Sequence, residues 1–161
     1  MRQFALIILL PAAIGCLQQT PPVQSTVHVA IPLDSVADVR AAVAHASEAP
    51  RAIIFIHVHW SILHPHSTQF QEFVSVWHSA HPEYPVSFHR IDFTEACGDY
   101  APITSLPGYS EWEQSAGRHP FGGNGEWAWI ADGKLVDIDA QLGTSNAELL
   151  KRTENAFLKV D

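Results

Sequence analysis

Cysteine is scarce in this chain, which has only Cys16 and Cys97 among its 161 residues. Dithiol–disulfide exchange needs one thiolate to attack and a nearby second thiol to resolve the mixed disulfide. The two cysteines are too far apart in sequence to form a Cys-x-x-Cys pair, so we expect no exchange of that type. Cys97 lies between acidic residues, Glu95 and Asp99, which disfavour a thiolate. We therefore expect it to be a structural residue, and a single-cysteine redox role for Cys97 is the weakest alternative.

Basic residues and long apolar runs are also few. Nine Lys and Arg stand against 17 Asp and Glu, a formal charge of −8. Binding to nucleic acid needs clustered Lys and Arg to displace phosphate counterions, so no nucleic-acid partner is expected. The apolar run over 4–10 is shorter than the roughly 20 residues that cross a bilayer as a helix.

The first residues nevertheless carry a targeting signal. A positive start at Arg2 and the apolar run are followed by Ala13-Ile14-Gly15-Cys16. This segment resembles the lipobox of bacterial lipoproteins, which implies cleavage before Cys16 and lipidation of its thiol. An ordinary secretory signal with an incidental Cys16 is the alternative.

The lipobox resemblance divides the chain into a signal peptide (1–15), the lipidated cysteine with a polar, Pro-bearing tether (16–25) and a domain (26–161). It implies export and a lipid anchor in the bacterial cell envelope, facing the periplasm, with the membrane as one partner.

Hydrophobic periodicity predicts an alternation of strands and helices in the domain. Alternating or continuous apolar residues predict strands over 27–31, 52–60, 86–93, 126–131 and 135–141, and helical spacing predicts helices over 34–47, 67–81, 109–116 and after Ser145. Asp132-Gly133 is a strong hairpin signal. Ser145 with Glu148 predicts a capping box.

This order of elements resembles the thioredoxin fold. The strand ending in Trp60 and the hairpin over 127–136 are the two local matches. The resemblance implies an α/β domain with a central mixed sheet of about four to five strands flanked by helices.

Three departures from the thioredoxin pattern bear on chemistry. Ser61 and His64 stand where the family has its two cysteines, and Phe55 stands where many members bury an acid. Gly125 precedes the strand at which the family places a cis-proline. We therefore expect a domain that has lost redox exchange, and favour a protein-binding or assembly module over an enzyme.

The degenerate active-site surface is the expected contact site for an unidentified protein or peptide partner, together with the long loop over 95–125. Its residues are Trp60, Ser61, Ile62, Leu63, His64 and Gly125. Tyr109 and Trp112 would complete an aromatic groove if they lay beside Trp60. A Ser61–His64 nucleophile pair lacks a third group to orient the imidazole.

Histidines support the main rival hypothesis, a periplasmic Zn- or Cu-binding or delivery protein. The candidate ligands are His57, His59, His64 and His66. His57 and His59 share one face of a strand. In the favoured hypothesis there is no cofactor, and His57 is a packed residue of the central strand. The histidines at 78, 81, 89 and 119 are predicted to lie on the surface.

Overall fold

The computed structural model describes residues 36–57, 66–92, 100–116, 124–139 and 144–158. The predicted signal, lipobox and tether, the strand over 27–31 and Cys97 lie outside these ranges. Within them, no helix is both long and apolar enough to cross a bilayer.

A four-stranded mixed sheet forms the centre of the domain. Its strands are β1 (Arg51–His57), β2 (Ser87–Asp92), β3 (Asn124–Ala131) and β4 (Lys134–Asp139), in the order β2-β1-β3-β4. β1 pairs in parallel with β2 and antiparallel with β3, and β3 pairs antiparallel with β4. Residues 52–56 of β1 are fully buried, because a continuous apolar run suits an interior strand covered on both faces.

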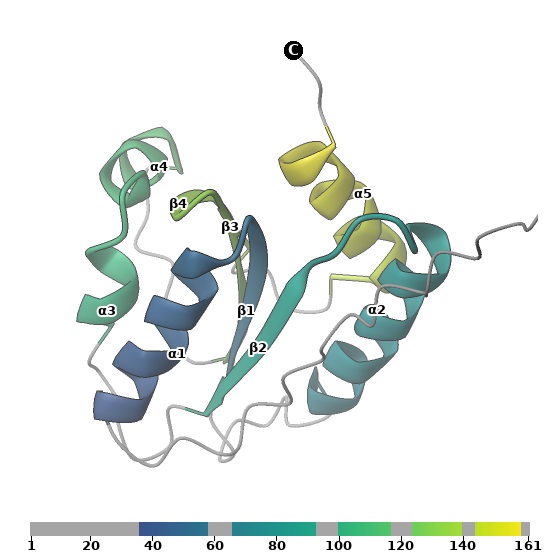
Figure 1. The fold of residues 1–161 in the computed structure, drawn as a ribbon, viewed down its shortest axis with the longest axis horizontal. Coiled ribbons are helices and arrows are strands. Elements are labelled where there is room, and N and C mark those ends of the chain that lie inside the picture. Colours follow the sequence, from purple (N-terminus) through teal and green to yellow (C-terminus); the bar gives the residue numbers. More distant parts are fainter. Residues whose placement is uncertain (1–35, 58–65, 93–99, 117–123, 140–143, 159–161) are drawn as a thin grey trace, which may run out of the picture.

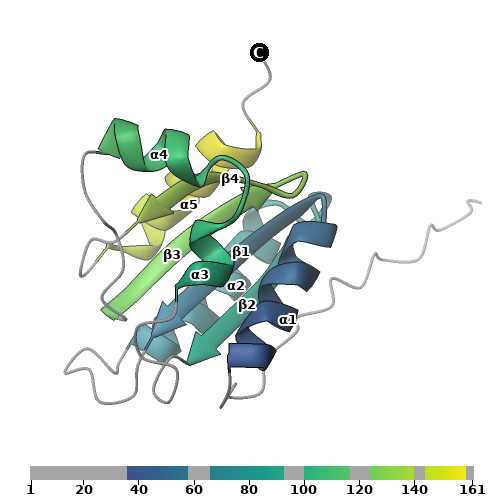
Figure 2. The ribbon, with the colours of Figure 1, turned by 90° about the vertical axis from the view of Figure 1, so that its left-hand side faces the viewer.

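Helices cover both faces of the sheet (Figures 1 and 2). One face carries α1 (Val36–Glu48), α3 (Ala101–Thr104) and α4 (Tyr109–Ala116), and the other carries α2 (His66–Ala80) and α5 (Asn146–Phe157). Strand alternation divides the core accordingly, since Ile54 and Ile56 join the cluster under α1 while Ile53 and Phe55 join the one under α2. The second cluster is strongly aromatic, with Phe70, Phe73, Trp77, Phe88, Trp127, Trp129 and Phe157.

Two local signals in the sequence are confirmed at the ends of elements. Asp132 and Gly133 both have positive φ, 49° and 73°, as a type I′ hairpin turn requires. Ser145 and Glu148 form the predicted capping box at the start of α5, where the Glu148 carboxylate accepts from the Ser145 N–H at 2.8 Å. Hydrogen bonds from Ser145 lower the pKa of Glu148.

The prediction of the fold class is confirmed. A parallel β-α-β unit, an antiparallel hairpin and a closing helix make a mixed sheet with helices on both faces, which is a thioredoxin-like arrangement. The helix over 109–116 has the predicted bounds. α3 was not predicted, because Pro102 suggested a loop, whereas proline suits the first turn of a helix.

Two histidines differ from their predicted surface positions. His89 is only 5% exposed, because it shares with Ile91 the face of β2 under α1, and its Nε2 bonds to Ser87 Oγ at 2.8 Å. His81 is half-buried against Trp77, with its Nε2 2.9 Å from a Glu154 carboxylate oxygen on α5. Both rings therefore belong to the packing of the domain.

Candidate functional site

The candidate site lies where β1 ends. His57, the last residue of β1, is aligned with Asp92 at the end of the parallel β2 and with Asn124 at the start of β3. The arrowheads of β1 and β2 lie at the same end of the sheet in Figure 2. Because α2 begins at His66, the connection over 58–65 carries the residues predicted to replace the dithiol.

His57 is packed as the sequence predicts for a central-strand residue. Its ring stacks on Phe55, with centroids 5.6 Å apart and planes 20° apart. Phe55 in turn contacts Phe70 at 5.5 Å and Trp127 at 4.8 Å. The Nε2 atom of His57 is buried. The imidazole is therefore the outermost ring of an aromatic stack beneath α2.

Gly125 lies within β3 rather than before it, which corrects the predicted strand boundary. The pairing of β3 with β1 shifts there, since Ile56 is aligned with Glu126 but His57 with Asn124. Gly125 is thus the extra residue of a β-bulge, at φ +104°. A side chain rarely adopts that conformation, so glycine allows the strand to bend beside the candidate site. All peptide bonds among the described residues are trans.

Glu126 is a buried acid that sequence reasoning missed. It is 3% exposed and is aligned with Ile56 across the β1–β3 pair. Phe55, at the position where the family often buries an acid, is fully buried in the aromatic stack instead. The sequence signal for this burial was the one charged residue, Glu126, in the otherwise apolar strand predicted over 126–131. Its carboxyl must be enclosed once helices cover both faces of the sheet.

The other predicted site residues are only partly covered by the structure. Trp60, Ser61, Ile62, Leu63 and His64, together with His59, lie outside the described residues, and His66 is placed only as the first residue of α2. Of the four candidate metal ligands, the structure thus positions the ring of His57 alone. Among the side chains it does describe, no three His, Cys, Asp or Glu gather in a metal-binding group.

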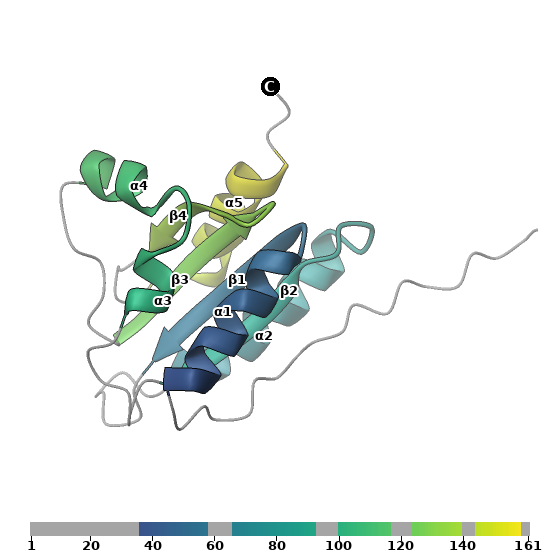
Figure 3. The same ribbon diagram turned by 60° about the vertical axis from the view of Figure 1, so that its left-hand side comes forward.

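Tyr109 and Trp112 do not lie at the end of β1, where the conditional groove would need them. Their rings are 6.4 Å apart on α4, and Trp112 reaches Asp137 of β4. Asp137 is aligned with Trp129 and, through it, with Ile53, four residues before His57 and so about 13 Å along the strand. Figure 3 shows α4 beside β4, away from the β1 arrowhead.

Tyr109 is buried under α4 and has a specific partner. Its hydroxyl donates to the Glu113 carboxylate at 3.0 Å. Burial first, and then the hydrogen bond and charge of Glu113, raise the pKa of Tyr109 from 10.0 to about 12. The phenol is therefore a neutral donor at physiological pH, and its role is to hold one turn of α4 on the core.

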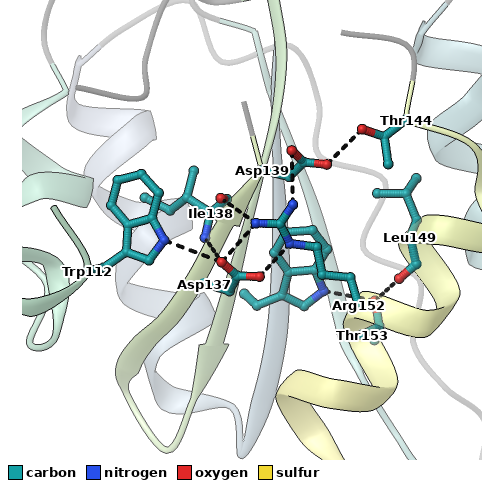
Figure 4. A network of polar contacts seen from close by, with 9 residues as sticks. Trp112, Asp137, Ile138, Asp139, Thr144, Leu149, Arg152 and Thr153 are labelled. Carbon is teal, nitrogen blue, oxygen red and sulfur yellow. Dashed lines mark hydrogen bonds and ion pairs between the residues drawn. The ribbon is translucent and has the colours of Figure 1, made fainter. Parts of the chain in front are cut away.

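A polar network joins β4 to helices on both faces of the sheet (Figure 4). The Asp137 carboxylate accepts from Trp112 Nε1 at 3.3 Å and from Arg152 Nη2 at 3.0 Å. Arg152 Nη1 lies 3.0 Å from the Asp139 carboxylate, which also accepts from Thr144 at 2.8 Å. One side chain of α4 and one of α5 thus meet at a single carboxylate of the edge strand.

Electrostatics favour the charged form of Arg152 in this network. The hydrogen bond to Asp137 is the largest effect, and despite partial burial it raises the pKa of Arg152, with Asp139 adding to it. The guanidinium also lies 5.4 Å from the Trp129 ring centroid, within range of a cation–π contact. Asp139 is 1% exposed, so Arg152 supplies the positive charge that a buried carboxylate requires.

Comparisons with known proteins show a likeness to solved structures alone. No family model and no curated protein matches the chain. Among solved structures, Plasmodium falciparum thioredoxin is 13% identical, with 78% of this chain and 98% of that chain covered at a TM-score of 0.46. Malassezia sympodialis thioredoxin is 14% identical, with 81% and 97% covered and a TM-score of 0.46. Reduced desulfothioredoxin from Desulfovibrio vulgaris is 18% identical, with 70% and 88% covered and a TM-score of 0.43.

Proposed function

We propose that this chain is a lipid-anchored protein of the bacterial cell envelope whose thioredoxin-like domain lacks dithiol chemistry and binds a protein or peptide partner. The observation that carries the proposal is the pair Ser61 and His64. Both fall in the connection between β1, which ends at His57, and α2, which begins at His66. This is the strand–helix junction where the thioredoxin resemblance places two cysteines.

Loss of the thiols removes the covalent step and leaves the recognition surface. A hydroxyl and an imidazole cannot form the mixed disulfide through which a thioredoxin engages a client. The connection still carries Trp60, Ile62 and Leu63, and apolar and aromatic side chains are suited to a peptide contact. The bulge at Gly125 lies opposite Ile56 and His57, the last residues of β1 before this connection.

The absence of exchange can be tested with one assay and one gain-of-function variant. The full-length chain should not reduce insulin disulfides with a dithiol donor, and turnover would refute the proposal. The double variant Ser61→Cys/His64→Cys should form an intramolecular disulfide, because the strand–helix junction holds such positions within bridging distance. A folded double variant that stays reduced under oxidising conditions would contradict the placement of Ser61 and His64 at that junction.

Partner binding can be tested by site-specific photo-crosslinking in cells. A photoreactive amino acid in place of Ile62 should yield one discrete protein adduct. Ser79, exposed near the far end of α2, is the matched control position and should yield none. Equal adducts at both positions, or none at Ile62, would refute a binding surface at the β1–α2 connection.

The anchor has its own test. Cys16→Ser should abolish incorporation of labelled fatty acid and release the chain from the detergent phase on phase separation. Persistent partitioning of that variant would refute lipidation at Cys16 while leaving the domain's binding role open to the crosslinking test.

A further inference from the structure

Backbone groups of the edge strand β4 are hydrogen-bonded to side chains and to a loop carbonyl. The Ile138 N–H donates to Asp137 Oδ1 at 2.8 Å, and the Ile138 carbonyl accepts from Arg152 Nη2 at 2.9 Å. Further along, the Leu135 N–H donates to the Pro107 carbonyl at 2.8 Å. These groups of β4 therefore already have partners, although β4 lies at an end of the described sheet.

Trp112 completes this cover from the other face of the sheet. Asp137 is aligned with Trp129, whose ring packs in the cluster under α2 and α5, whereas Trp112 packs against the cluster under α1. The indole nevertheless donates to Asp137 Oδ1, so the contact passes around the edge of β4 (Figure 4). We call Trp112, Asp137 and Arg152 the edge cap.

An uncapped β4 would be complementary to a second copy of itself. In an antiparallel pair centred between Val136 and Asp137, Lys134 is aligned with the partner's Asp139 and Leu135 with the partner's Ile138. Leu135 and Ile138 are buried in the core cluster under α1, so this register would continue that apolar layer from one copy into the next. Opposite charges and apolar residues placed directly across two strands both stabilise a sheet. Val136, 39% exposed at the register shift of β4, offers further apolar surface at the same place.

We propose that the edge cap prevents β4 from pairing with β4 of a second copy and so keeps the domain monomeric. A strand at the edge of a sheet is a template for another chain because its backbone groups lack partners. Here the carboxylate and guanidinium occupy the backbone groups of Ile138, and the indole obstructs the approach. Any partner strand must first displace charged side chains that are already hydrogen-bonded.

The decisive variant is Asp137→Ala in the full-length chain, purified in a mild non-ionic detergent. It removes the acceptor for the Ile138 N–H and for Trp112, and it removes one of the two carboxylates that position Arg152, leaving only Asp139. We expect the sedimentation coefficient to shift from monomer to dimer at concentrations at which the wild type stays monomeric. Adding Val136→Lys should restore the monomer, because a lysine on an edge obstructs strand pairing.

Thr153→Val is the matched control. It breaks the buried bond between Trp129 and Thr153, the residue that follows Arg152 in α5, but leaves all three residues of the cap in place. It should lower stability without producing a dimer. Dimerisation of this control to the same extent, a wild type already dimeric through β4, or a folded Asp137→Ala that stays monomeric would each overturn the proposal.

Two further measurements keep the proposal testable if Asp137→Ala does not fold. Arg152→Lys retains a positive charge beside Asp139 but gives up the planar fork that reaches Asp137 and the Ile138 carbonyl together. It should also dimerise, and a folded, monomeric Arg152→Lys would overturn the proposal. In the wild type, hydrogen exchange of the Ile138 amide should be slowed, and exchange at the rate of an unstructured peptide would refute the cap.

Discussion

The Trp129 indole and the Thr153 hydroxyl meet in a hydrogen bond of 2.8 Å between β3 and α5, and both residues are fully buried. The hydroxyl in turn donates a hydrogen bond to the Leu149 carbonyl at 2.8 Å, one turn earlier in α5. Thr153 thus provides the acceptor for the indole N–H of a tryptophan in the aromatic cluster. The same bond links α5 to β3.

Thr153→Val should lower the free energy of unfolding by about 1–3 kcal/mol, because it leaves the indole N–H buried without an acceptor. Urea denaturation followed by tryptophan fluorescence would measure the loss. Thr153→Ser, which retains the hydroxyl, should lose less. Equal losses for the two variants would show that the methyl group, and not the hydrogen bond, stabilises this position.

Alkaline pH should destabilise the domain through Tyr109. The pKa of this phenol is raised from 10.0 to about 12 in the folded chain, so the unfolded chain loses its proton at lower pH. The contribution of Tyr109 is therefore complete below about pH 10 and is lost as the pH rises toward about 12. Urea unfolding at about pH 9 and about pH 11 should show a smaller pH-dependent loss in Tyr109→Phe than in the wild type. An identical loss in both chains would contradict this assignment.

Gly108→Ala should be more damaging than the same change at Gly133. Both glycines have positive φ, +88° and +73°, so either substitution incurs about 1–2 kcal/mol of backbone strain. A Cβ on Gly108 would also lie 2.3 Å from the Leu135 carbonyl oxygen, against 3.2 Å between a Cβ on Gly133 and the Ser47 oxygen. Melting temperatures of the two variants would test the difference. Equal values would contradict the prediction, because they would show that the 105–108 turn moves away from Leu135 without loss of stability.

Zinc and copper should not raise the stability of the chain. A metal that binds the folded state raises the melting temperature by mass action, and the ring of His57 is stacked on Phe55 with its Nε2 buried. Metal analysis of the purified chain should find no stoichiometric Zn or Cu. A thermal shift with added metal that disappears in His59→Ala/His64→Ala would promote the metal-binding hypothesis to first place.

Much of the fold could be predicted because its signals are local. The apolar run of β1, the turn at Asp132-Gly133 and the cap at Ser145 each depend on a few neighbouring residues, and all three are confirmed. The burial of His89 and Glu126 was missed, because it depends on which strand faces which helix. The edge cap was missed for the same reason, since Trp112, Asp137 and Arg152 come from three separate elements.

The candidate site was only partly predictable for a related reason. Sequence reasoning located the β1–α2 connection and the packed ring of His57. It offered Tyr109 and Trp112 as part of a groove only on the condition that they lay beside Trp60, because aromatic residues in a loop can reach many places. In the structure Trp112 instead donates to the Asp137 carboxylate, which lies about 13 Å from the level of His57 along the strand direction.

The position of β1 between β2 and β3 also sets the order in which the chain can fold. β2 follows β1 after one helix, but β3 arrives only after the whole stretch from 93 to 123, and pairings this distant in sequence form slowly. A nascent chain that ends before Asn124 therefore presents one side of its most apolar strand without a partner. Until the hairpin emerges, that side of β1 is where aggregation of an incomplete chain would begin.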